Sequence, residues 1–555
     1  MYYPPWFVES LNGDAWMFAQ VMAVLLAVAA FLDEFRRRLL KDRHDLLQLI
    51  GLLALTVGLR WYFYNPVVYE HSHYTALERL PRMMVLLSSA ADHLLGVVFS
   101  PYRGVFAFNL ALAVLSPLLI ALHTELIFEK KAMSWFSAWL LACHPMHIKL
   151  SSTEAPVISS LFLGALVFVL FHLTVKRPGW RAQVPMALVM LLILPAFLLT
   201  RPLNFLAFPV LYVFAVLYRR DIRPHPLLWA FLAALLAVNL GFIRVLDSST
   251  QMLSPRHSVQ ILHSFRRLFF SEHNVLFNPW VVSWPGLALL ALGTAVFAVS
   301  MPEGMALVAI WYLGTMAVTS VALSETVVGN SKYFLQLIYP LIIMSAHAVR
   351  LIRRPWMWAP AMALVLSMPW LSAAYIRKDL DYQHEYRLVA RTAALLRPGD
   401  QILEIPFAVN HQGERVRAYY ANYLHWGEEA SPPARAPSFI DDVAGVDLTR
   451  RNVYFFCGLE CDAQRALARP GSATPYDAVF ARFDLQPVMG TTRRREVFMF
   501  FTSGLSMEVN THEFERQHPT MRVTLYRLRG LRAPSAQKVS IKLSRRVPEE
   551  TTSGE

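Results

Sequence analysis

The sequence predicts an all-α polytopic membrane domain of about twelve transmembrane helices, followed by a small C-terminal α/β domain outside the cytoplasm. Three observations predict this architecture. The 555 residues are 55% hydrophobic and only 16% charged, whereas soluble domains carry about 25% charged residues. The apolar residues occur in blocks long enough to cross about 30 Å of hydrocarbon as helices. After residue 375 the chain becomes polar, with glycine and proline between short β-like runs.

The apolar runs predict the membrane spans in order. The basic residues of the first run follow it rather than precede it, so we interpret this run as a span and not as a cleavable signal. Spans are expected at Ala15–Leu32, Leu46–Tyr64, Val105–Phe128, Met133–Ile148, Val157–Val175, Val184–Leu199, Leu203–Leu217, Leu227–Val245, Val281–Val299, Met305–Leu323, Tyr333–Val349 and Trp356–Tyr375.

The connections between these spans predict the orientation. In a soluble protein the net charge of +13 would suggest a nucleic-acid partner, but here much of the excess lies in alternate short connections. Such connections are cytoplasmic under the positive-inside bias. Both termini are then expected outside, in the periplasm if the membrane is a bacterial inner membrane; a eukaryotic endoplasmic reticulum is the alternative. The basic connections carry Arg36, Arg37, Arg38, Lys41 and Arg43; Lys130 and Lys131; Lys176, Arg177 and Arg181; Arg219, Arg220 and Arg223; and Arg350, Arg353 and Arg354.

The outer segments divide the chain into domains. Residues 1–375 are predicted to form the membrane domain, with long outer loops at 65–104 and 246–280. Within 376–531, the β-like runs QILEIPFAV, NVYFFCG, EVFMFF and VTLYRL follow a helix-like run, which predicts a small α/β domain. The polar end, 532–555, is predicted to be disordered.

The stretch Tyr64–Arg82 is the strongest candidate for a reaction site. It places Glu70, His71, His73 and Tyr74 just beyond the outer end of a predicted span. A carboxylate at the boundary between water and a low dielectric can have a raised pKa and act as a general base. We therefore take Glu70 and His73 as catalytic candidates, with His71 and Tyr74 in the same pocket. The alternative is an ordinary solvated loop.

Two metal questions remain open in the sequence. Glu70, His71 and His73 carry ligand types that hold divalent ions, but the pattern E-H-x-H alone is a weak signal, and a cofactor-free site is the alternative. Cys457 and Cys461 are four residues apart in the polar segment. Two thiols without further ligands do not predict zinc, whereas a disulfide would form in an oxidising compartment.

Several further ionisable residues lie at predicted outer ends of spans. Arginine binds phosphate through its planar fork, although anchoring at the membrane interface is the alternative for each cation. Glu154 follows the run HPMHIKLSST and would share a pocket with Glu70, or else lie in an exposed turn. The cationic candidates for a lipid phosphate are Arg201, Lys332, Arg266 and Arg267.

These features resemble the GT-C superfamily of membrane glycosyltransferases, which includes the protein mannosyltransferases and the lipid A aminoarabinose transferases. The segment YEHSHY (69–74) stands where that family carries a catalytic acid in its first outer loop. HPMHIKLSSTEAPVISS, TRPLNFLAFPVLY and NSKYFLQLIYP are similar to later family elements. Two residues depart from the family pattern, since Tyr69 replaces an acidic residue and Lys332 stands where arginine is more usual.

The resemblance implies an inverting transfer of a sugar from a polyprenyl-phosphate donor to a lipid, glycan or protein acceptor. Glu70 would deprotonate the acceptor, and Arg201, Lys332 or Arg266 would stabilise the leaving phosphate. Two other functions stay open. A transporter or flippase for lipid-linked glycans would need ionisable residues in mid-span, and only His123, Glu125 and His172 come near this position. A non-catalytic assembly protein would tolerate changes in the outer loops.

Overall fold

The computed structural model describes much of the predicted membrane domain and part of the C-terminal segment. The described residues are 14–64, 101–153, 157–176, 179–200, 278–302, 305, 335–377, 387–389, 391–392, 395–397, 399–403, 405, 438–440, 443–449, 451–458, 461–462, 465–466, 474–494 and 517–532. The chain divides into a helical unit (1–384, 421–431 and 497–501) and a sheet unit (385–420, 432–496 and 502–555).

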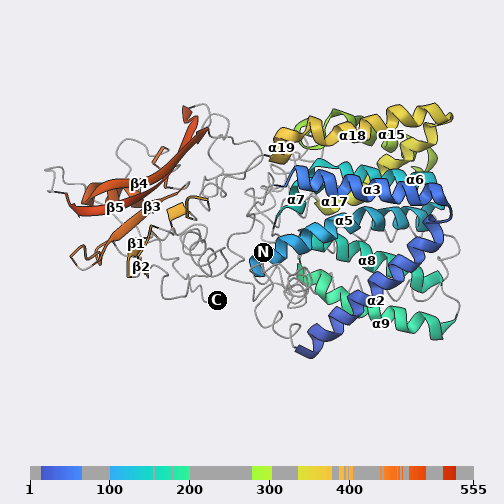
Figure 1. Ribbon diagram of the computed structural model, residues 1–555, viewed down its shortest axis with the longest axis horizontal. Helices are drawn as coiled ribbons and strands as arrows, with labels where there is room; N and C mark the ends of the chain where they lie inside the picture. Colours follow the sequence, from blue (N-terminus) through green and yellow to red (C-terminus); the bar gives the residue numbers. More distant parts are fainter. Residues whose placement is uncertain are drawn as a thin grey trace, which may run out of the picture. The chain divides into compact units, whose positions relative to one another are not determined.

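The described helices of the helical unit come from two stretches of the chain and pack together (Figure 1). The first stretch comprises α2 (Asp14–Leu39), α3 (Arg43–Tyr62), α5 (Pro101–Phe128), α6 (Lys131–Cys143), α7 (Pro145–Ser151), α8 (Val157–Lys176) and α9 (Trp180–Thr200). The second comprises α14 (Pro279–Val282), α15 (Trp284–Ser300), α17 (Leu335–Ser345), the 3₁₀ segments η5 (Ala346–Leu351) and η6 (Pro355–Met357), α18 (Trp358–Leu371) and α19 (Ala373–Arg377).

Several of these helices can cross a membrane. Within the described residues, five are long and apolar enough, and three shorter apolar helices accompany them. The predicted class, a mostly helical membrane protein with a small sheet, therefore holds at this coarse level. The predicted spans Leu203–Leu217, Leu227–Val245 and nearly all of Met305–Leu323 lie outside the described residues. The five candidates are Phe18–Leu39, Arg43–Tyr62, Phe108–Phe128, Val157–Thr174 and Pro355–Arg377.

One predicted span is divided in two. The run Met133–Ile148 was predicted as a single helix, but α6 ends at Cys143 and α7 begins at Pro145. Between them, His144 is extended, with φ −68° and ψ 120°. Proline disfavours the helical conformation in the residue before it and lacks an N–H to continue the helix, so the break follows from Pro145.

The connection after α2 is shorter than the sequence analysis predicted from its basic residues. Arg36, Arg37 and Arg38 were assigned to the connection, but they form the last turn of α2. There Arg37 contacts Asp33, and Arg38 contacts Glu34, four residues earlier in each case. Such pairs and the helix dipole both favour cations in a last turn, which explains why the helix continues through the basic run.

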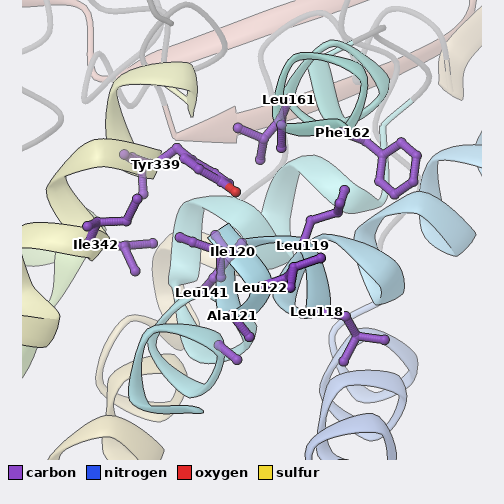
Figure 2. Close-up of a cluster of buried hydrophobic side chains, with 14 of the residues drawn as sticks. Leu118, Leu119, Ile120, Ala121, Leu122, Leu141, Leu161, Phe162, Tyr339 and Ile342 are labelled. Carbon is purple, nitrogen blue, oxygen red and sulfur yellow. The ribbon is translucent and has the colours of Figure 1, made fainter. Parts of the chain in front are cut away.

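The core of the helical unit centres on α8, whose window Val157–Thr174 is completely buried. A helix that is apolar all round is expected at the centre of a bundle. Helix α8 packs against α5 and α9. Figure 2 shows its side chains Leu161 and Phe162 in one apolar cluster with side chains of α5, α6 and α17. Among the later helices, Gly293 allows α15 to approach the end of α17 closely, because a Cβ there would lie 2.5 Å from the Ser345 backbone.

The outer surface of the helical unit suits a lipid environment. Large apolar side chains such as Phe18 and Leu47 are exposed on α2 and α3. Exposed tryptophans lie near helix ends, including Trp61, Trp284 and Trp370 at one end and Trp180 and Trp356 at the other. Aromatic side chains gather at the two membrane–water interfaces, so this distribution supports a bundle that crosses a bilayer.

The sheet unit contains a mixed sheet. Its described strands are β1 (Gln401–Leu403), β2 (Ser438–Ile440), β3 (Val453–Cys457), β4 (Phe483–Arg494) and β5 (Thr520–Leu531), in the order β2-β1-β3-β5-β4. β1 is parallel to β2 and β3, whereas β5 is antiparallel to β3 and β4. Helix α23 (Pro475–Arg482) begins with a capping box between Thr474 and Asp477, and its Val479 packs with Phe455 of β3.

Three of the four predicted β-like runs contain described strands. β1, β3 and β5 occur within or around the runs that begin at Gln401, Asn452 and Val523, while EVFMFF lies outside the described residues. The sequence reading missed β2 and β4. β4 follows α23 directly and contains Pro487 and Gly490, which are residues depleted in strands.

The two cysteines of the sheet unit are bonded to each other. Cys457 ends β3, and its disulfide to Cys461 closes a short loop. Both residues are buried, at 4% and 1% exposure. The disulfide answers the question that the sequence left open.

Candidate functional site

The site residues predicted from the sequence lie outside the described residues, so their roles remain predictions. This holds for Glu70, His71, His73, Tyr74, Glu154, Arg201, Arg266, Arg267 and Lys332. The structure instead describes the helix ends from which several of their segments start, and the side chains gathered there.

Arg60 and His147 join α3 to α7 at one end of the helical unit, which we call the α7 end. The guanidinium Nη2 of Arg60 donates to Nδ1 of His147. Its Nη1 donates to two carbonyl oxygens, that of Thr56 at 3.0 Å and that of Ala142 at 3.3 Å. Arg60 is only 1% exposed and His147 is fully buried. The charge of Arg60 is therefore held inside the bundle by neutral acceptors.

Helix α7 carries further polar groups into the same end. All seven of its residues are buried. Lys149 Nζ donates to the carbonyl oxygen of Tyr375 at 2.8 Å and lies 4.8 Å from the centre of the Tyr375 ring, which ties α7 to α19. His144 precedes α7 and is 6% exposed. The break at Pro145 makes α7 a separate short helix, and this places its side chains at the α7 end. In one continuous span they would have followed the direction of α6.

The predicted acidic residues belong to segments that start at this end. The segment with Glu70 begins after Tyr64, two residues beyond the end of α3. Glu154 directly follows Thr153, whose carbonyl oxygen accepts from Asn109 Nδ2 of α5 at 2.9 Å. Helix α9, which Arg201 follows, also ends on the side of α7 in Figure 1. The start points of three predicted segments thus share one end of the helical unit.

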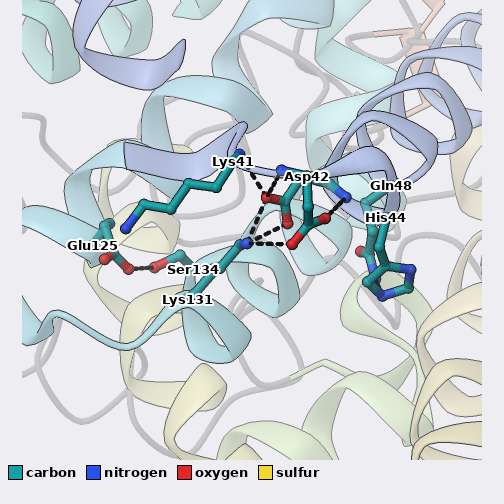
Figure 3. A network of polar contacts seen from close by, with 8 residues as sticks. Lys41, Asp42, His44, Gln48, Glu125, Lys131 and Ser134 are labelled. Atoms are coloured by element: carbon teal, nitrogen blue, oxygen red, sulfur yellow. Dashed lines mark hydrogen bonds and ion pairs between the residues drawn. The ribbon is translucent and has the colours of Figure 1, made fainter. Parts of the chain in front are cut away.

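The opposite end holds a satisfied ionic network (Figure 3). Lys131 Nζ contacts both Asp42 and Asp45, and the backbone N–H of Lys41 donates to Asp45 Oδ2 at 2.8 Å. Nearby, Ser134 Oγ donates to Glu125 Oε2 at 3.0 Å. Because each carboxylate of the network has a hydrogen-bond or ion-pair partner, we assign this end a structural role in fixing α3 against α6.

A second polar group lies in the bundle interior. His123 of α5 contacts the hydroxyl of Tyr339 of α17 through Nδ1 at 3.0 Å, and its ring centroid lies 5.8 Å from that of His172 of α8. All three residues are fully buried. The sequence identified both histidines but not Tyr339, because the contact with Tyr339 spans 216 residues.

A small cavity lies between α6, α15, α17 and α18. Its volume is about 30 Å³, and it is lined mainly by apolar residues, with His144 and Ser345 as its polar residues. This is enough for ordered water rather than for a sugar. Among the described residues, no group of three histidine, cysteine, aspartate or glutamate side chains is placed to hold a metal ion.

No family model, curated protein or solved structure matches this chain. The likeness to membrane glycosyltransferases therefore rests on the sequence features described above.

Sequence reasoning missed the Arg60–His147 pair as a site. A signal was present, because Arg60 is the one arginine in the apolar run Leu46–Tyr64, and a charged residue within a span usually faces the bundle interior. The partner could not be read locally, since 87 residues separate the two side chains.

Proposed function

We propose that this chain is an inverting membrane glycosyltransferase. It would transfer a sugar from a polyprenyl-phosphate donor to a lipid, glycan or protein acceptor at the outer face of a bacterial inner membrane. The sheet unit would lie on the same outer side, in agreement with its disulfide.

The observation that carries the proposal is the arrangement at the α7 end. The contact between Arg60 and His147 fixes the end of α3 beside α7, so the segments that carry Glu70 and Glu154 start close to each other. Two buried cations, Arg60 and Lys149, lie at this end. A site with carboxylates for proton transfer and cations for an anionic leaving group needs these components together.

In the proposed reaction, Glu70 accepts the proton of an acceptor hydroxyl. The acceptor oxygen bonds to the anomeric carbon from the face opposite the lipid phosphate, while the bond between that carbon and the phosphate oxygen breaks. The configuration is inverted, and the negative charge passes to the polyprenyl phosphate. Arg201, Lys332, Arg266 and Arg267 are the proposed partners of that charge. His73, His71 and Tyr74 would line the pocket.

The test is sugar transfer from a radiolabelled polyprenyl-phosphate donor in membranes that contain wild-type protein or Glu70→Gln at matched expression. The exposed Glu129, which follows α5 at the opposite end, provides the control Glu129→Gln. The proposal expects turnover in the wild type and the control, and a loss of at least about a hundredfold in Glu70→Gln. Equal turnover in all three proteins would remove Glu70 from the mechanism. Chelation in the same assay distinguishes a metal held by Glu70, His71 and His73 from a cofactor-free site.

A transporter or flippase for lipid-linked glycans is the second candidate, and the buried pair His123–Tyr339 favours it. Ionisable residues in the interior of a membrane bundle often mark a transport path. In that case His123→Phe would abolish movement of a lipid-linked sugar across proteoliposomes, whereas a transferase would retain turnover with the same variant.

A further inference from the structure

Arg60 is a buried cation without a counter-charge among the described residues. Its hydrogen-bond acceptors are two carbonyl oxygens and one imidazole nitrogen, all neutral. Arginine does not release its proton in proteins. A charge taken out of water in this way is costly unless an anion balances it. The described residues therefore supply no negative partner for Arg60.

Arg60 and His147 each keep one unpartnered nitrogen that acts as a hydrogen-bond donor. Because arginine can only donate, His147 must accept through Nδ1, and the proton of its neutral ring then lies on Nε2. Arg60 Nε and His147 Nε2 are both buried without a partner in the described part of the chain. Unfilled N–H donors on a cation and on its imidazole partner favour an anionic acceptor and disfavour a metal ion.

The position of Arg60 gives such a ligand a route. Arg60 lies in the last turn of α3, and the residues beside it reach the surface, with Trp61 83% exposed and Tyr64 48% exposed. An anion would therefore have to move only about one helical turn inward from the α7 end. Lys149 of α7 adds a second cation to this end.

We propose that Arg60 and His147 form a binding site for a phosphate group, either the head group of a membrane lipid or free phosphate. A tetrahedral oxyanion can accept from several directions at once, which matches donors on α3 and α7 and the planar fork of arginine. The site does not depend on sugar transfer, since a phosphate site at a membrane surface serves a transferase and a transporter alike.

The test measures binding of phosphate by the purified full-length protein in detergent. One arm uses radiolabelled inorganic phosphate in equilibrium dialysis at constant ionic strength. The other uses a long-chain isoprenyl monophosphate, with the uncharged isoprenol as its reference, and follows the thermal stability of the protein. Arg60→Met removes the buried charge, and Arg377→Met removes an exposed charge from the neighbouring α19 as the matched control.

We expect the wild type and Arg377→Met to bind alike and Arg60→Met to bind roughly tenfold to a hundredfold more weakly. Binding is compared at temperatures where each variant is folded, because Arg60→Met also removes three hydrogen bonds. If Arg60→Met does not fold, His147→Phe serves as the second variant and should weaken binding in the same way. Binding of both probes supports free phosphate, and binding of the isoprenyl monophosphate alone supports a lipid head group. Binding of neither probe, or equal binding by all variants, would overturn the proposal.

Discussion

Arg60 of α3 and His147 of α7 are in hydrogen-bond contact across 87 residues of sequence, and both side chains are buried. This contact connects the last turn of α3 to the short helix that follows Pro145.

The contact between Lys149 and Tyr375 predicts a stability effect at the same end. Lys149→Met removes the ammonium that donates to the Tyr375 carbonyl oxygen and should destabilise the helical unit by about 1–3 kcal/mol. Thermal unfolding in detergent measures this loss. The exposed Lys130→Met, at the opposite end, is the control and should have little effect. Similar losses in the two variants would show that the buried contact is not the cause.

The close approach at Gly293 predicts a steric effect. Gly293→Ala would place a Cβ about as near to the Ser345 backbone as a covalent second neighbour, at 2.5 Å, so α15 and the end of α17 must separate. We expect a loss of about 1–3 kcal/mol. Gly58→Ala on α3, where nothing lies within 4 Å of the added Cβ, should be neutral or slightly stabilising. Melting temperatures of the two variants and the wild type measure these effects. An unchanged melting temperature for Gly293→Ala would contradict the close packing at Gly293.

The disulfide predicts a thiol count. The chain has three cysteines, and Cys143 is the free one. Denatured protein purified from membranes should react with one equivalent of a thiol reagent before reduction and with three after it. Cys457→Ser with Cys461→Ser should lower the stability of the sheet unit, because the open loop gains freedom in the unfolded state. Three reactive thiols before reduction would place the sheet unit in a reducing compartment.

Tyr454 predicts an alkaline loss of stability in the sheet unit. Burial raises its pKa above the ordinary value of 10.0, and the neighbouring Asp400 raises it further. The folded state therefore favours the protonated phenol. The stabilisation from the protonated Tyr454 phenol is fully present below the pKa that this residue has in the unfolded chain. It is lost as the pH rises through the pKa that the residue has in the folded state. Denaturant unfolding between about pH 8 and 11 should show a smaller alkaline loss for Tyr454→Phe than for the wild type. Parallel curves would mean that Tyr454 titrates normally.

Local sequence patterns predicted the helices better than the site. The apolar runs that became α2, α3, α5 and α8 were long enough to be recognised from composition. The division at Pro145 was missed, although proline and its preceding residue carry the signal for it. β4 was missed because its partner strand β5, rather than its own residues, determines its conformation.

The candidate site shows the same limit. Glu70 and its neighbours were singled out by residue type and by their place beside a span, and their positions lie outside the described residues. Arg60 and His147 were each visible in the sequence, but only the fold brings them together. The absence of a nearby carboxylate among the described residues, which makes Arg60 informative, is a property of packing and not of sequence.

The location of the donor tests the central claim most directly. A polyprenyl-phosphate sugar with a photoreactive group beside the phosphate would be crosslinked to the protein in membranes, and the labelled peptides identified by mass spectrometry. We predict label at the α7 end, in peptides that contain Arg60, His147 or the segments that follow Tyr64 and Thr153, and competition by unlabelled donor. Label confined to the opposite end, around Asp45 and Lys131, or label that unlabelled donor does not reduce, would contradict the proposed site.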